Sequence, residues 1–217
     1  MPLEGCVSRD ALLPQSIELL RSPMFPGDAN DGLPMHPDPR FRYLRLQVKG
    51  STPAMLVLAF VDSHPMGEIE VWYSAQNQVL KLQNGRIVGS QGFALDWSMV
   101  RFPVAPPAWA DISPAGAHFE RERDEVPSYR YGVKERLTVQ PVDRAADLVW
   151  PSSLDAEVAK RYKWFREFAS PLKGEASTAW YAVEVQMGRH VVVYAEQCLK
   201  PDYCLQMQRW PLLQETR

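Results

Sequence analysis

The clearest fold signal in the sequence is the stretch Val79-Leu80-Lys81-Leu82-Gln83-Asn84-Gly85-Arg86-Ile87-Val88. It places an Asn-Gly pair between two apolar runs. A type I′ turn needs positive φ at both central residues, which Asn and Gly adopt readily, and this turn matches the twist of two antiparallel strands. We therefore predict a β-hairpin over residues 79–88.

Apolar and polar residues also alternate on both sides of this hairpin, as expected of half-buried strands. The run at 54–61 is apolar on both faces, which is typical of a central strand. At 129–139, Tyr129, Tyr131 and Val133 share the parity of one strand face. The predicted strands are 41–49, 54–61, 68–74, 79–83, 86–88, 95–102 (a strand or a short helix), 129–139, 179–186, 190–195 and 204–210.

The composition agrees with a β-rich fold, because the chain has 19 prolines in 217 residues and proline interrupts helices. We predict a mainly β protein whose antiparallel sheets form a sandwich or an incomplete barrel. Residues 41–217 would form a single β-rich domain. Residues 1–40 would form an irregular N-terminal tether with a short helix from Pro14. The proline-rich and charged segment 103–127 would run over the surface.

One segment has the period of a helix, since its apolar residues recur every three or four positions. Ser152 or Ser153 can cap its N-terminus, and Ser170-Pro171 would end it. We therefore predict one substantial helix over about 153–169. The recurring apolar residues are Leu154, Val158, Tyr162, Phe165 and Phe168.

The charge balance and the motifs argue against several classes of function. A formal net charge of −2 lacks the basic footprint of a nucleic-acid-binding protein. The longest apolar run, 54–61, is too short to cross a membrane as a helix. No nucleotide-binding loop or nucleophile motif is present, and the four histidines lack metal-ligand spacing. The histidines are His36, His64, His118 and His190.

Glu68 and Glu70 share the parity of one strand face. Two nearby carboxylates suit acid/base chemistry, but such a pair is more typical of a solvated outer face. We therefore predict a non-enzymatic protein with no catalytic residue, no metal-ligating residue and no cofactor.

The three cysteines divide into a pair and a single residue. Cys198 and Cys204 flank the turn signal Pro201-Asp202, and antiparallel strands on either side would bring their sulfurs together. We favour a disulfide, and so an oxidising compartment, over two free thiols in the cytosol. Cys6 ends Leu3-Glu4-Gly5-Cys6, which has the form of a bacterial lipobox.

A lipobox acts only behind an apolar signal, and no such signal is visible before Cys6. Either the signal lies upstream of Met1 or the four-residue match is a coincidence. Among the seven tryptophans, Trp97 and Trp109 flank irregular segments. Because sugar rings stack on exposed indoles, we expect these two to form a glycan or partner surface if they are exposed.

One region resembles a known family. A Trp72-Tyr73-Ser74 strand end, followed by a hairpin that carries Asn84-Gly85-Arg86-Ile87-Val88, is similar to the group 4 capsule polysaccharide lipoproteins of the YjbF/GfcB type. The resemblance is strongest over residues 40–100. It implies an antiparallel β fold and a lipoprotein on the periplasmic side of the outer membrane in Gram-negative bacteria, without catalysis. It also implies lipid attachment at Cys6, with residues 7–40 as the tether.

Three functions remain open. The first is a non-enzymatic lipoprotein that assists capsule or exopolysaccharide assembly and export. Its partners would be other export proteins or the polysaccharide, and it would touch the membrane only through the lipid. The second is a lipid or lipoprotein carrier with a half-open barrel, which an open apolar cavity would support. The third is a glycan-active enzyme, which needs two converging carboxylates beside Trp97 or Trp109.

Overall fold

The computed structural model describes residues 38–143, 156–172 and 174–210. This part of the chain forms a 12-stranded antiparallel sheet in the order β5-β4-β3-β2-β1-β12-β11-β10-β9-β8-β7-β6. The strands are β1 (Tyr43–Val48), β2 (Ala54–Asp62), β3 (Ile69–Ser74), β4 (Val79–Gln83), β5 (Arg86–Gln91), β6 (Asp96–Arg101), β7 (Ala117–Val126), β8 (Arg130–Val142), β9 (Lys163–Pro171), β10 (Ser177–Gln186), β11 (Arg189–Lys200) and β12 (Tyr203–Trp210). One helical turn, α2 (Ala156–Ala159), precedes β9.

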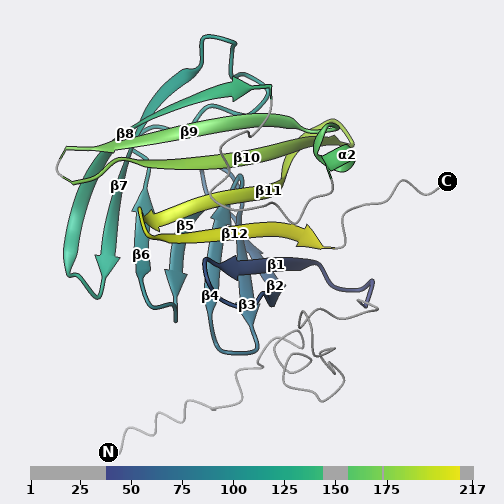
Figure 1. Cartoon of the computed structure of the whole chain (residues 1–217), viewed down its shortest axis with the longest axis horizontal. Helices are drawn as coiled ribbons and strands as arrows, with labels where there is room; N and C mark the ends of the chain where they lie inside the picture. The colour runs from purple at the N-terminus through teal and green to yellow at the C-terminus, as the bar shows by residue number, and fades with distance from the viewer. Residues whose placement is uncertain (1–37, 144–155, 173, 211–217) are drawn as a thin grey trace, which may run out of the picture.

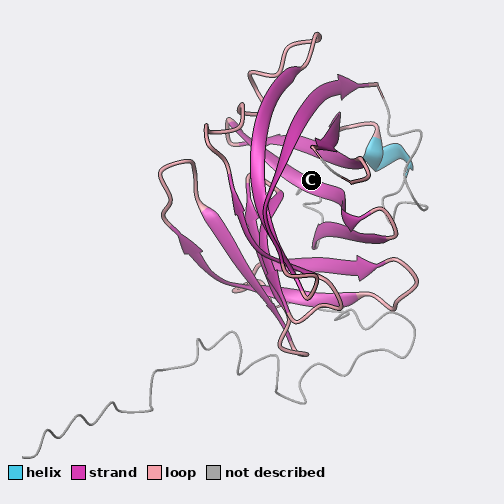
Figure 2. Cartoon of the chain, turned by 90° about the vertical axis from the view of Figure 1, so that its left-hand side faces the viewer, coloured by secondary structure: helices cyan, strands magenta, loops and turns pink. Residues whose placement is uncertain are grey.

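The sheet curls until its two edge strands, β5 and β6, come together, so the fold is a nearly closed, barrel-like sheet (Figures 1 and 2). Side chains fasten the two strands near the connection at 92–95. The backbone N–H of Trp97 donates to Ser90 Oγ over 3.0 Å, and the Ser90 hydroxyl donates to Asp96 over 2.8 Å. The prediction of a mainly β, antiparallel protein is therefore confirmed.

Neighbouring strands alternate in direction, so every second connection lies at the same end of the sheet. We call this the turn end. It carries the connections β1–β2, β3–β4, β5–β6, β7–β8, β9–β10 and β11–β12. The opposite end carries the long segment between β6 and β7 and the β4–β5 turn.

Apolar side chains fill the inside of the curled sheet, because alternate residues of each strand face inward. Trp72, Leu80 and Leu205 are fully buried there. A smaller cluster lies on the opposite face of β9, β10 and β11. In that cluster, the Trp164 indole N–H donates to the carbonyl oxygen of Ala159 in α2 over 2.9 Å. In the described ranges, no helix is long and apolar enough to span a membrane.

The predicted hairpin at 79–88 is confirmed as β4–β5. Asn84 and Gly85 form its turn with φ angles of 50° and 79°. Gly85 is required there for a second reason, because a Cβ atom at this position would lie 2.5 Å from Val192 on β11. The turn thus lies against the far wall of the sheet.

The predicted helix over 153–169 is wrong where the structure describes it. Only Ala156–Ala159 is helical, and β9 begins at Lys163. Trp164 and Phe165 are neighbours that are both buried, one on each face of the sheet. A strand buried on both faces contains apolar residues at many positions, and these positions also matched a helical period. Residues 153–155 and the predicted N-terminal helix lie outside the described residues.

The predicted surface excursion over 103–127 is wrong at its C-terminal end. The charged run there belongs to β7, which is paired with both β6 and β8. Arg121, Arg123 and Glu125 are buried, although charged residues are usually solvated. They pair with one another and with groups from other strands, as described below. The segment at 95–102 is a strand, β6, and not a helix.

Candidate functional site

The β7–β8 connection at the turn end presents two aromatic side chains to solvent. Tyr129 is 74% exposed and Tyr131 is 65% exposed, the highest values for aromatic residues in the described part of the chain. Arg130 lies between them and is also exposed. We call Tyr129, Arg130 and Tyr131 the tyrosine tip.

The sequence pattern places Tyr129 and Tyr131 on the same strand face as Val133, and this interpretation is wrong. Tyr129 lies in the turn with a φ of 52°, before β8 begins. The start of β8 then holds one residue more than β7 does, which breaks the alternation at Tyr131. The strand pairs that show the extra residue are Arg123 with Val133 and Glu125 with Arg130.

Two carboxylates hold the tip in place. Glu125 is fully buried and accepts hydrogen bonds from the Ser128 hydroxyl over 3.0 Å and from Arg130 Nε and Nη2 over 2.7 Å each. Asp124 accepts from the backbone N–H of Gly132 over 2.8 Å. These bonds fix the backbone on both sides of the two tyrosines, so their rings project from a rigid turn.

Beneath the tip, buried ion pairs continue into the sheet. Glu125 also pairs with Arg123, and Arg123 Nε lies 3.0 Å from Glu135 of β8. Arg121 Nε donates to Glu135 over 2.5 Å. The guanidinium groups of Arg121 and Arg123 lie 4.6 and 4.7 Å from the Trp97 ring centre. Burial alone would raise the pKa of Glu135, but the two arginines outweigh it and hold that pKa below its ordinary value.

A second buried group lies deeper inside the sheet. Arg86 Nε donates to Glu167 over 2.8 Å, and the Tyr181 hydroxyl donates to the same carboxylate over 3.2 Å. The Arg86 guanidinium lies 4.1 Å from the ring centre of Trp109, whose indole N–H donates to the Asn84 carbonyl oxygen over 3.0 Å. Burial, with the charge of Glu167 adding to it, raises the pKa of Tyr181 well above its ordinary value.

Gln197 of β11 satisfies backbone groups on the edge of β5. Its carboxamide nitrogen donates to the Gly85 carbonyl oxygen over 2.8 Å, and its oxygen accepts from the Ile87 backbone N–H over 3.0 Å. The Ile87 N–H belongs to β5, which has a hydrogen-bonded strand on one side only in the described part of the chain, and the Gly85 carbonyl belongs to the turn before it. A side chain from the opposite wall thus replaces the missing ladder bonds and holds the β4–β5 hairpin inside the sheet.

A small cavity separates the two ionic groups. Its volume is about 10 Å³, close to the space of one water molecule and far below the several hundred Å³ of a small-molecule site. The buried indole N–H of Trp97, which lines the cavity, has no hydrogen-bond partner among the described residues. The other polar residues in its wall are Arg121, Glu167, Ser177 and Gln197.

The arrangement suits a structural network better than acid/base catalysis. A glycosidase needs one carboxyl group free to donate a proton and another free to act on the sugar or on water. Here an arginine binds each of Glu125, Glu135 and Glu167, although Trp97 and Trp109 lie close by. The three carboxylates therefore neutralise buried arginines.

Trp97 and Trp109 do not meet the condition set for a glycan or partner surface, because neither is exposed. They are 2% and 5% exposed, and both belong to the inner apolar cluster. Trp109 comes from an irregular segment, but that segment turns inward and closes one end of the sheet against Phe165 and Tyr181. Indoles are large apolar groups whose burial is strongly favourable, and irregular flanking sequence does not prevent it.

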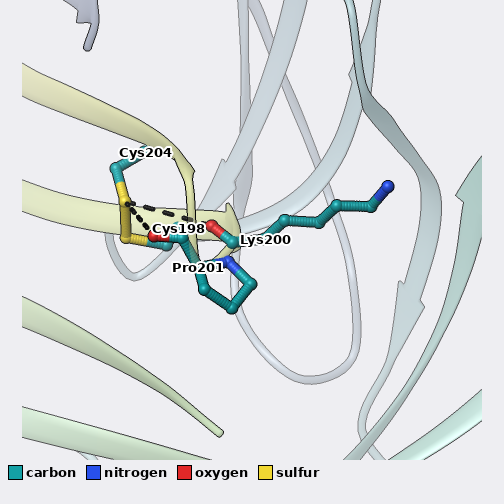
Figure 3. Close-up of a disulfide and its surroundings, with 4 residues drawn as sticks. All are labelled: Cys198, Lys200, Pro201 and Cys204. Carbon is teal, nitrogen blue, oxygen red and sulfur yellow. Dashed lines mark hydrogen bonds between the residues drawn. A yellow bond between two sulfur atoms is a disulfide. The ribbon is translucent and has the colours of Figure 1, made fainter. Parts of the chain in front are cut away.

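Cys198 and Cys204 face each other across the β11–β12 hairpin and form a disulfide (Figure 3). The predicted turn at Pro201-Asp202 joins these two strands. The disulfide lies at the turn end, and Cys198 contributes to the wall of the small cavity. Cys6 lies outside the described residues.

The remaining candidates make local contacts. His64 Nδ1 lies 3.1 Å from the Gln83 carboxamide nitrogen, and His118 Nδ1 lies 3.0 Å from the Thr138 hydroxyl. Among the residues that the structure describes, no group of three His, Cys, Asp or Glu side chains is placed to hold a metal ion.

Glu70 does not lie on a solvated outer face as predicted. It shares the inner face with Trp72, and both its carboxylate oxygens accept from Arg209 Nη2 over 2.9 Å. Arg42 donates to the same group over 2.6 Å. Glu68 precedes β3 and lies 3.7 Å from Arg189. Glu68 and Glu70 therefore form ion pairs with different arginines.

Comparisons with known proteins agree with this architecture. The model of the family described as group 4 capsule polysaccharide lipoprotein gfcB, YjbF matches residues 41–149, half of the chain. No curated protein sequence matches. A solved structure with a similar fold is that of the hypothetical lipoprotein YmcC from Escherichia coli (K12). It is 13% identical with a TM-score of 0.60, and the alignment covers 93% of this chain and 91% of that one.

At 13% identity, the likeness to YmcC shows the fold alone. The family match includes the β4–β5 hairpin and the Trp72-Tyr73-Ser74 strand end, and it extends through the strands that build the tyrosine tip. The chain therefore belongs to the group 4 capsule polysaccharide lipoprotein family.

Proposed function

We propose that this protein is a non-enzymatic lipoprotein that assists the assembly and export of a capsule polysaccharide or exopolysaccharide. The observation that carries the proposal is the family match over residues 41–149, since the family description names both a lipoprotein and a capsule polysaccharide. The protein would act on the periplasmic side of the outer membrane. A lipid on Cys6 would anchor it, with residues 7–40 as the tether.

The geometry supports this role over the two alternatives. A lipid carrier needs an open apolar cavity, whereas large side chains such as Trp72 and Trp109 fill the inside of this sheet. A glycan-active enzyme needs free carboxyl groups, whereas arginines bind Glu135 and Glu167. What the molecule offers is a rigid, disulfide-linked scaffold that presents side chains at its turn end.

The partners in this proposal are the exported polysaccharide and other proteins of the export system. A nucleic-acid partner is not part of it, because the formal net charge is −2. An oxidising compartment such as the periplasm agrees with the disulfide between Cys198 and Cys204.

Deletion of the gene tests the role in export. We expect the deletion strain to carry less surface polysaccharide, and plasmid expression of the wild-type gene to restore it. The measurement is uronic acid or total hexose in washed cells and in the culture supernatant. Unchanged polymer in both fractions would contradict the proposal.

Lipid attachment is tested by expressing the gene together with its upstream nucleotides in cells fed labelled palmitate. We expect label on the wild-type protein and on a Ser8→Ala control, and no label on Cys6→Ser. Label on Cys6→Ser at the wild-type level would show that Cys6 is not the site.

A further inference from the structure

We propose that the tyrosine tip binds sugar rings of the exported polysaccharide through stacking on Tyr129 and Tyr131. This inference rests on the proposed function and adds a contact site to it. Its starting point is that these two rings are the most exposed aromatic side chains in the described part of the chain.

An exposed aromatic ring on a well-held backbone binds a ligand at a lower cost in conformational entropy than a ring on a mobile segment. The tip meets this condition. Glu125 holds the turn through Ser128 and Arg130, and Asp124 holds it through Gly132. The β9–β10 turn also approaches the tip, since a Cβ atom at Gly174 would lie 4.0 Å from Arg130 Nη1. The backbone that carries the rings is therefore held before a ligand arrives, and binding has to order only the side-chain torsions of the two tyrosines.

The size of the apolar surface favours a sugar over a folded protein. Two aromatic side chains bury about 300–500 Å² together, whereas a stable protein interface needs about 800 Å² on each partner. Most exposed side chains on β6 and β8 beside the tip are charged, and a charged surround does not enlarge an apolar interface core; Met99 of β6 is the exposed apolar residue among them. The charged residues include Arg101, Lys134 and Arg136. One pyranose ring, in contrast, is covered by one phenol face, and its hydroxyl groups suit charged surroundings.

A polymer compensates for weak contacts to single rings. Its repeating units present many copies of the same sugar, so a chain that leaves one tip is close to rebinding. The assay must therefore use the polymer and not a monosaccharide. Affinity electrophoresis fits this need, because a native gel that contains polysaccharide slows a protein in proportion to its binding.

The experiment uses the purified wild-type chain. The gels contain exopolysaccharide extracted from the bacterial strain that encodes this protein. We expect retardation of the wild type, and at least about fivefold weaker retardation for the double variant Tyr129→Ala/Tyr131→Ala. Tyr129→Phe/Tyr131→Phe should keep most of the retardation, since it keeps both rings. Phe168→Ala is the matched control, because Phe168 is an aromatic residue 46% exposed on β9.

Three outcomes would overturn the inference. They are no retardation of the wild type, equal retardation of the alanine variant, or an equal loss in Phe168→Ala. Circular dichroism and the melting temperature of each variant exclude unfolding as the cause of a loss. The export test separates this inference from the proposed function. Export that depends on the gene, without retardation in the gel, would leave the proposed function in place and remove the sugar site.

Discussion

Arg86 and Glu167 form a buried ion pair. Removing one partner should destabilise the protein more than replacing both partners with apolar residues. Each side chain is only 2% exposed, and the two lie 2.8 Å apart. Removing one partner of such a pair leaves an uncompensated charge inside the protein, which costs about 3–5 kcal/mol. We therefore expect Arg86→Met to lower the free energy of unfolding by about that amount. This is a large part of the roughly 5–15 kcal/mol that stabilises a typical domain.

The double variant Arg86→Met/Glu167→Leu removes both charges and keeps similar volumes. Its main remaining cost is the Tyr181 hydroxyl, which loses its acceptor, at about 1–3 kcal/mol. We expect the double variant to be more stable than Arg86→Met alone. The sum of the two single losses should exceed the loss in the double variant by at least about 3 kcal/mol.

The free energy of unfolding is measured by urea titration with tryptophan fluorescence for wild type, Arg86→Met, Glu167→Leu and the double variant. Trp109 lies beside Arg86 and reports on this region directly. Two results would refute the reasoning. A loss below about 1 kcal/mol for Arg86→Met would mean that water reaches the pair and screens it. Losses that simply add in the double variant would mean that the two side chains do not stabilise each other.

Three further predictions concern the hairpins and the network under the tip. Cys198→Ser should lower the free energy of unfolding by about 2 kcal/mol, because the disulfide closes a loop with a sequence separation of 6; wild type in reducing agent should show the same loss in a urea titration. Gly85→Ala should cost about 2–4 kcal/mol, since φ is positive there and the added Cβ would meet Val192; a melting curve like that of wild type would contradict the inward position of the turn. The lowered pKa of Glu135 means that the unfolded chain binds its proton more tightly. The contribution of Glu135 to stability is therefore complete above its ordinary pKa of 4.5 and is lost as the pH falls through the lower pKa of the folded state. Between about pH 3 and 7, the urea concentration at the unfolding midpoint should depend less on pH in Glu135→Gln than in wild type.

Local signals predicted most of the sheet. The Asn84-Gly85 turn is where the pattern placed it, and the strands predicted at 54–61, 179–186 and 190–195 are found as β2 and the β10–β11 hairpin. In the two hairpins, turn chemistry and alternation agree with the final packing, whereas β2 is a central strand whose apolar Phe60 and Val61 are exposed. The Cys198–Cys204 hairpin belongs to the same class, because its turn residues and its two thiols both favour antiparallel strands.

The pattern failed where a strand is buried on both faces or carries charges inward. In β9, Trp164 packs on one face and Phe165 on the other, so apolar residues appear at a helical spacing by coincidence. The candidate glycan surface at Trp97 and Trp109 lacks the exposure that it requires, for a related reason. A sequence reports which residues are aromatic, but whether Trp97 or Tyr131 meets solvent depends on strands far away in the chain, which cover the first and leave the second uncovered.

The charged run of β7 nevertheless contains a signal of its own fold. Its signs alternate with a period of two, with Arg121 and Arg123 facing inward and Glu122 on the opposite face beside Arg101. This alternation fixes the register of β7, because a slip by one residue reverses every side chain. Acidic residues would then face Glu135 in the interior, and arginines would lose the Trp97 ring. Because like charges cannot share a buried site without a large cost, the interior charges exclude the slipped pairing and so fix where the tyrosine tip emerges.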